Sequence, residues 1–234
     1  MGRHFEVRAA AMAASGAKKS ALYMRASKEI YMAAKGGLPD PDSNLSLRSA
    51  IDKYKGLSVP KDVIERAIKK ASGGEAEAYS TGRYEAFGPG NSLIVVDTLT
   101  DNVNRAFIDI RTAITRKGGR LATVAYNFTE VGLLVFKGED PDRFGEALIL
   151  ADVDVKDISG YDGHIEIQVA PTALNAAKSA LKELSIEDFD VCEITMLPNE
   201  TIALEGEHLD TFKALLDVLD ELQDVQNVYH NVEL

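Results

Sequence analysis

The stretch from Thr81 to Phe128 constrains the fold of this chain most, because it joins turn, strand and helix signals in one continuous pattern. Gly88–Gly90 is a Gly-Pro-Gly segment typical of a turn between two strands, and the apolar run Leu93–Val96 follows it. Apolar residues at helical spacing come next, and the short run Val124–Phe128 closes the stretch. We therefore predict strands around one helix, in a βαβ-like order.

Both ends of that helix carry residues suited to helix termini. Asp101 or Asn102 can cap the first turn, because a short side-chain oxygen accepts a hydrogen bond from a free backbone amide. At the other end, Arg116 and Lys117 suit the negative pole of the helix. Gly118 can adopt the left-handed conformation that ends it.

Residues 1–75 show a different pattern, which predicts helices with short connections. At about 100° per residue, four cations fall in one stripe of the helix predicted between residues 18 and 35. These are Lys18, Arg25, Lys28 and Lys35. The stripe suits contacts to phosphates, and it equally suits the solvated surface of a small helical bundle.

From residue 131 the order of predicted elements is βαββαβ, the ferredoxin-like arrangement. Asp140-Pro141 opens its first helix, and Asp162-Gly163 forms the tight turn between its central strands. A helix over residues 207–222 and a strand over residues 225–230 follow. This last αβ pair can complete the middle sheet, which makes the ferredoxin-like unit an insertion.

The predicted fold class is therefore α+β, with three domains. Residues 1–75 form a helical basic domain, residues 76–130 and 200–234 a middle α/β domain, and residues 131–199 an acidic ferredoxin-like domain. The whole chain has a formal charge of -11, but residues 1–75 hold 14 Lys and Arg against 8 Asp and Glu, which gives +6 and leaves -17 for the rest. Only one end of the molecule is expected to attract phosphates.

Composition narrows the cellular setting. The apolar fraction of 45% is ordinary for a folded soluble protein. No run reaches the roughly 20 apolar residues that cross a bilayer, and the start lacks the apolar core of a secretory signal. We expect a cytoplasmic protein with no membrane partner.

Four segments resemble signature segments of the YebC/PmpR family. They are Arg83–Gly90, Leu99–Arg105, Val124–Phe128 and Asp224–Asn231. The resemblance covers nearly the whole chain and implies a three-domain regulator of gene expression, described for some members as DNA-binding transcriptional regulation and for others as translation on the ribosome. The N-terminus departs from the family pattern, because Phe5 stands in place of a tryptophan and several cations are missing. We expect this arm to bind phosphates more weakly than in its relatives.

The resemblance and the charge pattern together select the residues expected to bind nucleic acid. They are Arg3, Arg8, Lys18, Lys19, Arg25, Lys28 and Lys35 in the helical domain, and Arg83, Asn102, Asn104, Arg105 and Arg111 in the middle domain. The expected partner is DNA or ribosomal RNA, the latter on the ribosome itself. A structural alternative stays open, in which both asparagines bond to nearby backbone and Arg105 pairs with Asp101 or Asp109 at helical spacing.

Nothing in the sequence indicates catalysis. Gly88–Gly90 lacks the Lys-Ser or Lys-Thr of a phosphate-binding loop, and the four histidines are too far apart for a metal-ligand spacing. We expect no cofactor, no metal and no enzymatic activity. An enzyme and a protein-interaction module with an acidic face are the rival classes. Lysines and alanines on the candidate helix suit phosphates better than base edges, which favours structured RNA, whereas the family description favours DNA.

Overall fold

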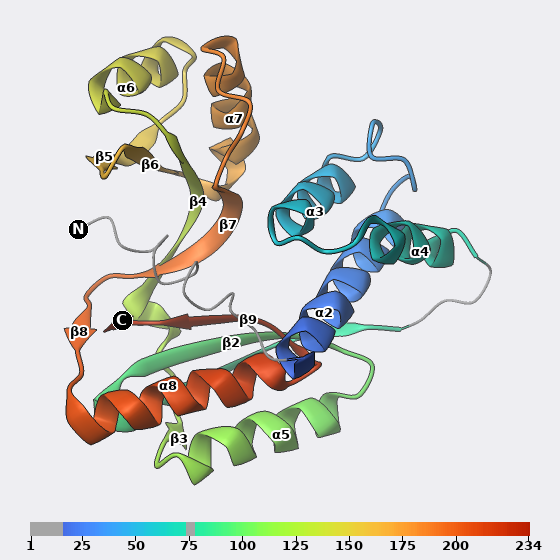
Figure 1. The fold of residues 1–234 in the computed structure, drawn as a ribbon, viewed down its shortest axis with the longest axis vertical. Coiled ribbons are helices and arrows are strands. Elements are labelled where there is room, and N and C mark those ends of the chain that lie inside the picture. The colour runs from blue at the N-terminus through green and yellow to red at the C-terminus, as the bar shows by residue number, and fades with distance from the viewer. Residues whose placement is uncertain (1–15, 74–77) are drawn as a thin grey trace. The chain divides into compact units, whose positions relative to one another are not determined.

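The computed structural model describes residues 16–73 and 78–234, and contacts divide the chain into two compact units (Figure 1). One unit includes residues 129–197. The other combines the described residues up to Phe128 with those from Pro198 onward. This larger unit holds both the N-terminal helices and the middle sheet, so a domain boundary at residue 75 stays a prediction.

The described part of the larger unit begins with three helices, of which α3 has a side-chain cap. Their bounds are α2 (Gly16–Lys35), α3 (Leu45–Gly56) and α4 (Lys61–Ala71). Asn44 caps α3, because its side-chain oxygen accepts a hydrogen bond from the Leu47 amide at 3.0 Å. Its side-chain nitrogen donates to the carbonyls of Ala33 and Leu38, both at 2.9 Å. One asparagine thus starts α3 and fixes the loop that leads to it.

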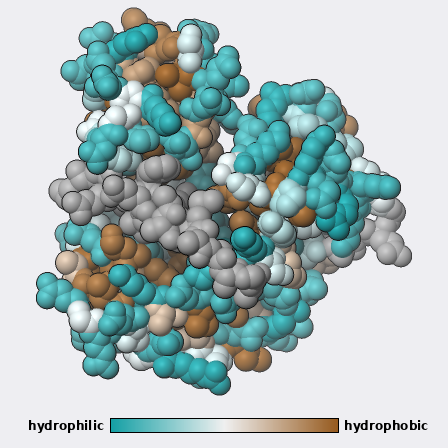
Figure 2. All heavy atoms as spheres, in the orientation of Figure 1, coloured by the Kyte–Doolittle hydropathy of each residue, from teal (hydrophilic) through white to brown (hydrophobic). Residues whose placement is uncertain are grey.

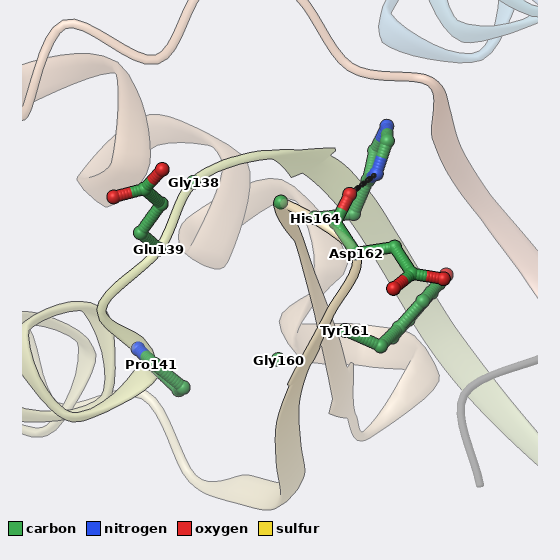
Figure 3. A pocket seen from close by; sticks show the side chains of 8 residues that line it. Gly138, Glu139, Pro141, Gly160, Tyr161, Asp162 and His164 are labelled. Atoms are coloured by element: carbon green, nitrogen blue, oxygen red, sulfur yellow. Dashed lines mark hydrogen bonds between the residues drawn. The ribbon is translucent and has the colours of Figure 1, made fainter.

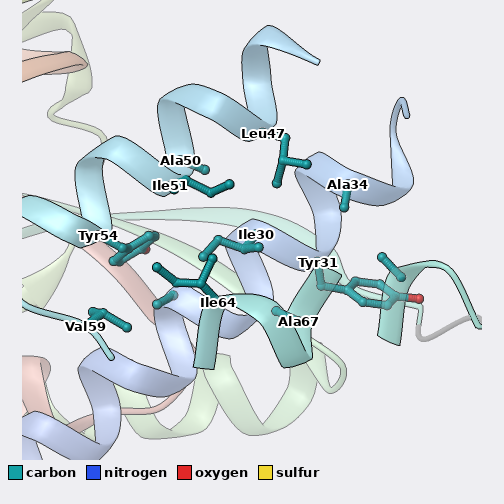
Figure 4. Close-up of a cluster of buried hydrophobic side chains, with 12 residues drawn as sticks. Ile30, Tyr31, Ala34, Leu47, Ala50, Ile51, Tyr54, Val59, Ile64 and Ala67 are labelled. Atoms are coloured by element: carbon teal, nitrogen blue, oxygen red, sulfur yellow. The ribbon is translucent and has the colours of Figure 1, made fainter. Parts of the chain in front are cut away.

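Side chains from α2, α3 and α4 share one apolar core (Figure 4). Ile30 and Leu47 are fully buried, and the rings of Tyr31 and Tyr54 are 2% exposed. Burying a large apolar side chain stabilises a fold by about 1.5–3 kcal/mol. The core therefore binds the three helices into a small bundle.

The middle sheet has the strand order β3-β1-β2-β9, and its neighbouring strands are antiparallel. Its strands and helices are β1 (Ser80–Phe87), β2 (Leu93–Thr100), α5 (Val103–Arg116), β3 (Arg120–Leu121), α8 (Gly206–Glu221) and β9 (Val225–His230). Val96 of β2 lies opposite Val228 of β9, and Phe212 and Leu215 of α8 enter the core beside Ile110 of α5. The C-terminal αβ pair therefore completes this sheet, as predicted.

The turns of this sheet also follow the sequence. A 3-10 turn, η1 (Pro89–Asn91), joins β1 to β2, and Gly90 there has a φ of 63° that favours glycine. Past α5, Gly118 has a φ of 77° and ends the helix. A short parallel pair, β8 (Ile202–Ala203) with β10 (Val232–Glu233), joins the segments on either side of α8 and β9.

The segment Val124–Phe128 is not the strand that the sequence predicts. Residues Ala125–Asn127 form the 3-10 turn η2, and strand β4 (Phe128–Lys137) begins only after it. The strand–helix–strand order is present, but its second strand is β3, which pairs with β1. The physical reason for the turn is a carboxylate far away in sequence, since Glu85 of β1 binds the backbone amides of Val124 and Ala125.

The unit of residues 129–197 is the predicted ferredoxin-like insertion. After β4 come α6 (Pro141–Leu150), β5 (Val155–Tyr161), β6 (His164–Val169), the 3-10 turn η3 (Pro171–Ala173), α7 (Leu174–Glu183) and β7 (Val191–Pro198). The strand order β5-β6-β4-β7 is that of a ferredoxin-like sheet. Asp162 and Gly163 have φ of 45° and 76°, as a tight hairpin turn requires. The α+β class and the insertion are therefore confirmed.

Candidate nucleic-acid interface

Three of the four cations in the predicted stripe of α2 face acidic residues near the end of α8. Lys18 forms an ion pair with Asp217, and Arg25 donates to the carbonyl of Asp220. Lys28 is 8% exposed and reaches Asp224. These three cations therefore form ion pairs within the larger unit, where α2 packs against the end of α8.

Asp224 is the buried centre of a charge cluster. Its Oδ1 atom accepts hydrogen bonds from Lys28 Nζ at 2.8 Å and from Arg105 Nη2 at 2.9 Å, and its Oδ2 atom accepts one from Arg105 Nε at 2.8 Å. Arg105 Nη2 also donates to Asp101 at 2.7 Å. We call Lys28, Asp101, Arg105 and Asp224 the Asp224 cluster.

Backbone oxygens complete the environment of Lys28. Its ammonium group donates to the carbonyls of Leu99 at 3.1 Å and Gln223 at 2.9 Å. With Asp224, the three N–H groups of the ammonium have three acceptors. This geometry favours a structural role for Lys28, while its predicted role as a phosphate ligand stays a prediction.

The electrostatics of the Asp224 cluster favour its charged forms. Burial would raise the pKa of Asp224, but hydrogen bonds from Arg105 and Lys28 outweigh it and lower that pKa below the ordinary range. Hydrogen bonds to Asp224 and Asp101 raise the pKa of Arg105. In the neighbouring pair, the hydrogen bond to Asp217 raises the pKa of Lys18. All these groups remain ionised at neutral pH.

Two more of the predicted binding residues also bond within the protein. Arg83 of β1 lies opposite Asp97 of β2 and binds its carboxylate through two hydrogen bonds, of 2.6 and 2.9 Å. Asn102 caps α5, because its side-chain oxygen accepts a hydrogen bond from the Arg105 amide at 3.0 Å. The cap fits the structural alternative for Asn102, the Arg83–Asp97 pair was not foreseen, and a binding role stays a prediction for both residues.

The other predicted residues that the structure describes lie at the surface. They are Lys19 and Lys35 on α2, and Asn104 and Arg111 on α5. Arg3 and Arg8 lie outside the described residues. The predicted set therefore includes exposed side chains and side chains that are paired within the larger unit.

Sequence reasoning missed the acidic partners of the cation stripe. Asp217, Asp220 and Asp224 follow one another at steps of three and four residues, which place them on one side of a helix and its end. They meet Lys18, Arg25 and Lys28 in the same order along the chain. Matching spacing of opposite charges in two distant segments was a signal that could have been found.

Sequence reasoning also missed how the turn before β4 is held. Both amides that Glu85 binds, those of Val124 and Ala125, lie 2.6 Å from its Oε2 atom. Asn127 Nδ2 donates to the Val124 carbonyl at 3.0 Å. The amide of Asn199 donates to the Asn127 carbonyl at 2.8 Å. We call residues Val124–Asn127 the Tyr126 turn.

Replacing Glu85 with alanine is expected to lower the free energy of unfolding by about 2–4 kcal/mol, because two amides lose a charged acceptor. Urea denaturation of the purified protein measures this. Glu200→Ala at an exposed position is the matched control and should change stability by less than about 0.5 kcal/mol. A loss no larger than that of the control would show that Glu85 does not hold the Tyr126 turn.

A shallow hollow of about 290 Å³ lies in the ferredoxin-like unit (Figure 3). Three glycines, Gly138, Gly160 and Gly163, form much of its wall. His164 Nδ1 lies 3.1 Å from the carbonyl oxygen of Asp162 on its rim. Glu139 lies on one side of the hollow, and Tyr161, Asp162 and His164 lie on the other.

No cluster of three His, Cys, Asp or Glu side chains within residues 16–73 and 78–234 is arranged to hold a metal ion. None of the helices in these ranges is both long enough and apolar enough to span a bilayer.

Comparison with known proteins identifies the family of this chain. The model of the TACO1/YebC protein N-terminal domain matches residues 3–74, and that of the TACO1/YebC second and third domain matches residues 79–232. The probable transcriptional regulatory protein Mfl546 of Mesoplasma florum is 48% identical over 237 residues, and the match covers 100% of each chain. The crystal structure of the conserved hypothetical protein Aq1575 from Aquifex aeolicus has a TM-score of 0.76 and 30% identity, covering 93% of this chain and 91% of that one. Since the two models together span nearly the whole sequence, the chain belongs to the TACO1/YebC family.

Proposed function

We propose that this protein is a regulator of gene expression that acts by binding nucleic acid, with transcription as its main process. The observation that carries the proposal is the full-length likeness to a protein named as a probable transcriptional regulator, at 48% identity. Because the match covers 100% of both chains, it supports the same kind of function for both.

Charge supports nucleic acid as the partner. The first 75 residues carry +6, although the rest of the chain carries -17. Lys18, Arg25 and Lys28 are paired with acidic residues near the end of α8. Other lysines of the helical bundle are exposed, including Lys35 and Lys55. Figure 2 shows hydrophilic side chains over the outer face of α3 and α4. Such a surface attracts phosphates without reading base sequence.

We propose that regulation needs binding alone and no turnover. The titratable groups with clearly shifted pKa values, Lys18, Arg105 and Asp224, belong to intramolecular ion pairs. Shifted pKa values at a catalytic site would instead surround a cleft that admits substrate. An enzyme needs a nucleophile or a general base, and no motif in the sequence indicates one.

RNA is a second candidate partner, and the chemistry of the exposed bundle surface favours it. Its outward cations include Lys19, Lys35, Lys55 and Lys69, which contact phosphates as point charges. Reading duplex DNA by sequence ordinarily requires arginine, asparagine or glutamine at base edges. Binding assays on duplex DNA and on structured RNA, each across a range of salt concentrations, separate the two partners.

Changing Lys35, Lys55 and Lys69 together to glutamate is expected to reduce the slope of log affinity against log salt by about two to three units. Each lysine neutralises one phosphate and releases about one counterion, so its loss lowers the slope as well as the affinity. Filter binding or fluorescence anisotropy on labelled duplex DNA and RNA measures both.

The matched control changes Lys137, Lys156 and Lys182 to glutamate. These three lysines are exposed on the acidic ferredoxin-like unit, and the net change in charge is the same. The control variant therefore separates the effect of losing local phosphate contacts from the effect of changing the net charge. Equal slopes in the two triple variants would refute the helical bundle as the phosphate-binding surface.

A further inference from the structure

Tyr126 is an exposed aromatic residue on a turn whose backbone is firmly held. Its side chain is 73% exposed, more than that of any other aromatic residue recorded as exposed in the described ranges. The backbone amides of Val124 and Ala125 donate hydrogen bonds to Glu85. Asn199 Nδ2 donates a hydrogen bond to the backbone carbonyl of Tyr126 at 3.4 Å. Folding therefore fixes the position of Tyr126 and leaves its ring in solvent.

An exposed tyrosine ring contributes little to folding, since most of its apolar surface remains in water. Fixing its backbone still costs conformational entropy. A ring held in one place in solvent loses less entropy when it binds a flat partner, which is the benefit of a preorganised contact. The turn is therefore suited to present Tyr126 to a ligand.

Arg120 is a cation on β3, the strand beside β1. Its guanidinium lies 4.5 Å from the centre of the Phe87 ring, and Arg120 pairs with Phe87 of β1. Phe87 and Glu85 are two residues apart on one strand, so their side chains point to the same face. Glu85 holds the backbone of the Tyr126 turn and Phe87 lies beside the Arg120 guanidinium, so the turn and the cation are anchored to the same face of β1.

The segment of sequence that leads from α5 to the Tyr126 turn is locally basic. Between Asp109 and Glu130 there is no acidic residue, although residues 76–234 carry -17 overall. The same interval holds four cations, Arg111, Arg116, Lys117 and Arg120. Glu85 lies close by, but its carboxylate is engaged by two backbone amides. Arg111 and Arg116 belong to α5, which packs on the other face of the sheet, so Arg120 is the cation that this face offers to a polyanion.

We propose that Tyr126 stacks on an unpaired base of single-stranded RNA while Arg120 contacts an adjacent phosphate. A flat ring beside a cationic strip is how proteins hold single strands, because every base has a face that stacks and every linkage has a phosphate. RNA is the chosen partner because its recognition centres on unstacked bases in loops and ends. This inference rests on the proposed function and assigns it a second contact, away from the helical bundle.

Tyr126→Trp provides a direct test, because the natural chain contains no tryptophan. Binding of an unstructured, mixed-sequence oligoribonucleotide should quench the fluorescence of the introduced indole, since a stacked base lies against it. Leu150→Trp is the matched control, at a position that is 89% exposed on the ferredoxin-like unit, and its fluorescence should not change.

Affinity measurements on the same oligonucleotide complete the test. Tyr126→Ala should weaken binding about tenfold, and Tyr126→Phe should retain it, because stacking needs the ring and not the hydroxyl. Tyr126→Leu, which keeps an apolar side chain without a ring, should behave as alanine does. Arg120→Gln should lower the salt slope by about one unit. Thermal unfolding should be unchanged in all four variants of Tyr126, including Tyr126→Trp.

The outcomes separate this inference from the function on which it rests. If the natural protein binds RNA but the introduced indole is not quenched and Tyr126→Ala binds equally well, the stacking site is wrong and the proposed function stands. Tighter binding and stronger quenching with the matching single-stranded DNA would overturn RNA as the partner. If the natural protein binds neither RNA nor DNA at low salt, the proposed function itself fails.

Discussion

Asp224→Ala is expected to lower the free energy of unfolding of the larger unit by about 3–5 kcal/mol. The carboxylate is 3% exposed and bonds to Lys28 and Arg105. Its removal leaves the Lys28 ammonium buried with only two carbonyl oxygens, and an uncompensated buried charge is costly. Urea denaturation followed by circular dichroism measures the loss.

Asp217→Ala is the matched control for this prediction. Asp217 also pairs with a lysine of α2, but its side chain is 64% exposed, and exposed pairs contribute about 0–1 kcal/mol. Lys28→Met combined with Asp224→Leu should recover part of the loss, because an apolar pair of similar volume avoids the desolvation of charges. Similar effects of Asp224→Ala and Asp217→Ala would contradict the central role of the buried carboxylate.

The lowered pKa of Asp224 gives its contribution a defined pH dependence. A carboxylate whose pKa is lower in the folded protein stabilises that state above its ordinary pKa and loses the effect as pH falls through the folded value. The natural protein should therefore lose this part of its stability below about pH 4. The difference in stability between the natural protein and Asp224→Ala should shrink over the same range.

Ending the chain after Pro198 is expected to abolish cooperative folding of the middle sheet. The deletion removes β9 from its place beside β2, and Phe212, Leu215 and Leu219 from the core. Each of these large side chains contributes about 3 kcal/mol or more in a packed core, which exceeds the stability of an ordinary domain when summed. Amide hydrogen exchange should show protection lost in β1 and β2.

The reciprocal deletion is the control. Replacing residues 129–197 with a short Gly-Ser linker should leave the larger unit folded, because the amide of Asn199 already lies 2.8 Å from the carbonyl of Asn127. The insertion therefore enters and leaves the unit at adjacent points. A truncated chain that ends at Pro198 and still unfolds cooperatively, with β1 and β2 protected, would show that the C-terminal αβ pair is dispensable.

Local patterns in the sequence predicted most of the architecture. The turn at Asp162-Gly163 and the alternation of helices and strands are local signals, and they fixed the ferredoxin-like order. The cap of α5 was narrowed to Asp101 or Asn102, and the structure assigns it to Asn102. The completion of the middle sheet was predicted because that sheet lacked a second helix and strand, and the C-terminal αβ pair lacked a sheet to join.

Long-range polar contacts account for what the sequence did not predict. The stripe of α2 was correctly placed on one helix face, but its partners Asp217, Asp220 and Asp224 lie nearly the whole chain away. The run Val124–Phe128 is short and apolar, which suits a strand, and only the distant carboxylate of Glu85 makes it a turn. Periodicity carries no information about such pairings.

The pairing of β2 with the last strand of the chain also determines when the larger unit can close during synthesis. Ile94 and Val96 present an apolar face early, but α8 and β9, which cover and extend that sheet, leave the ribosome last. The insertion has its own core and can fold first, which shortens the effective loop between β2 and β9 and lowers the entropy cost of joining them. The hairpin of β1 and β2 therefore stays partly uncovered until α8 and β9 have been synthesised, and a chaperone that binds apolar strands would find its target in that interval.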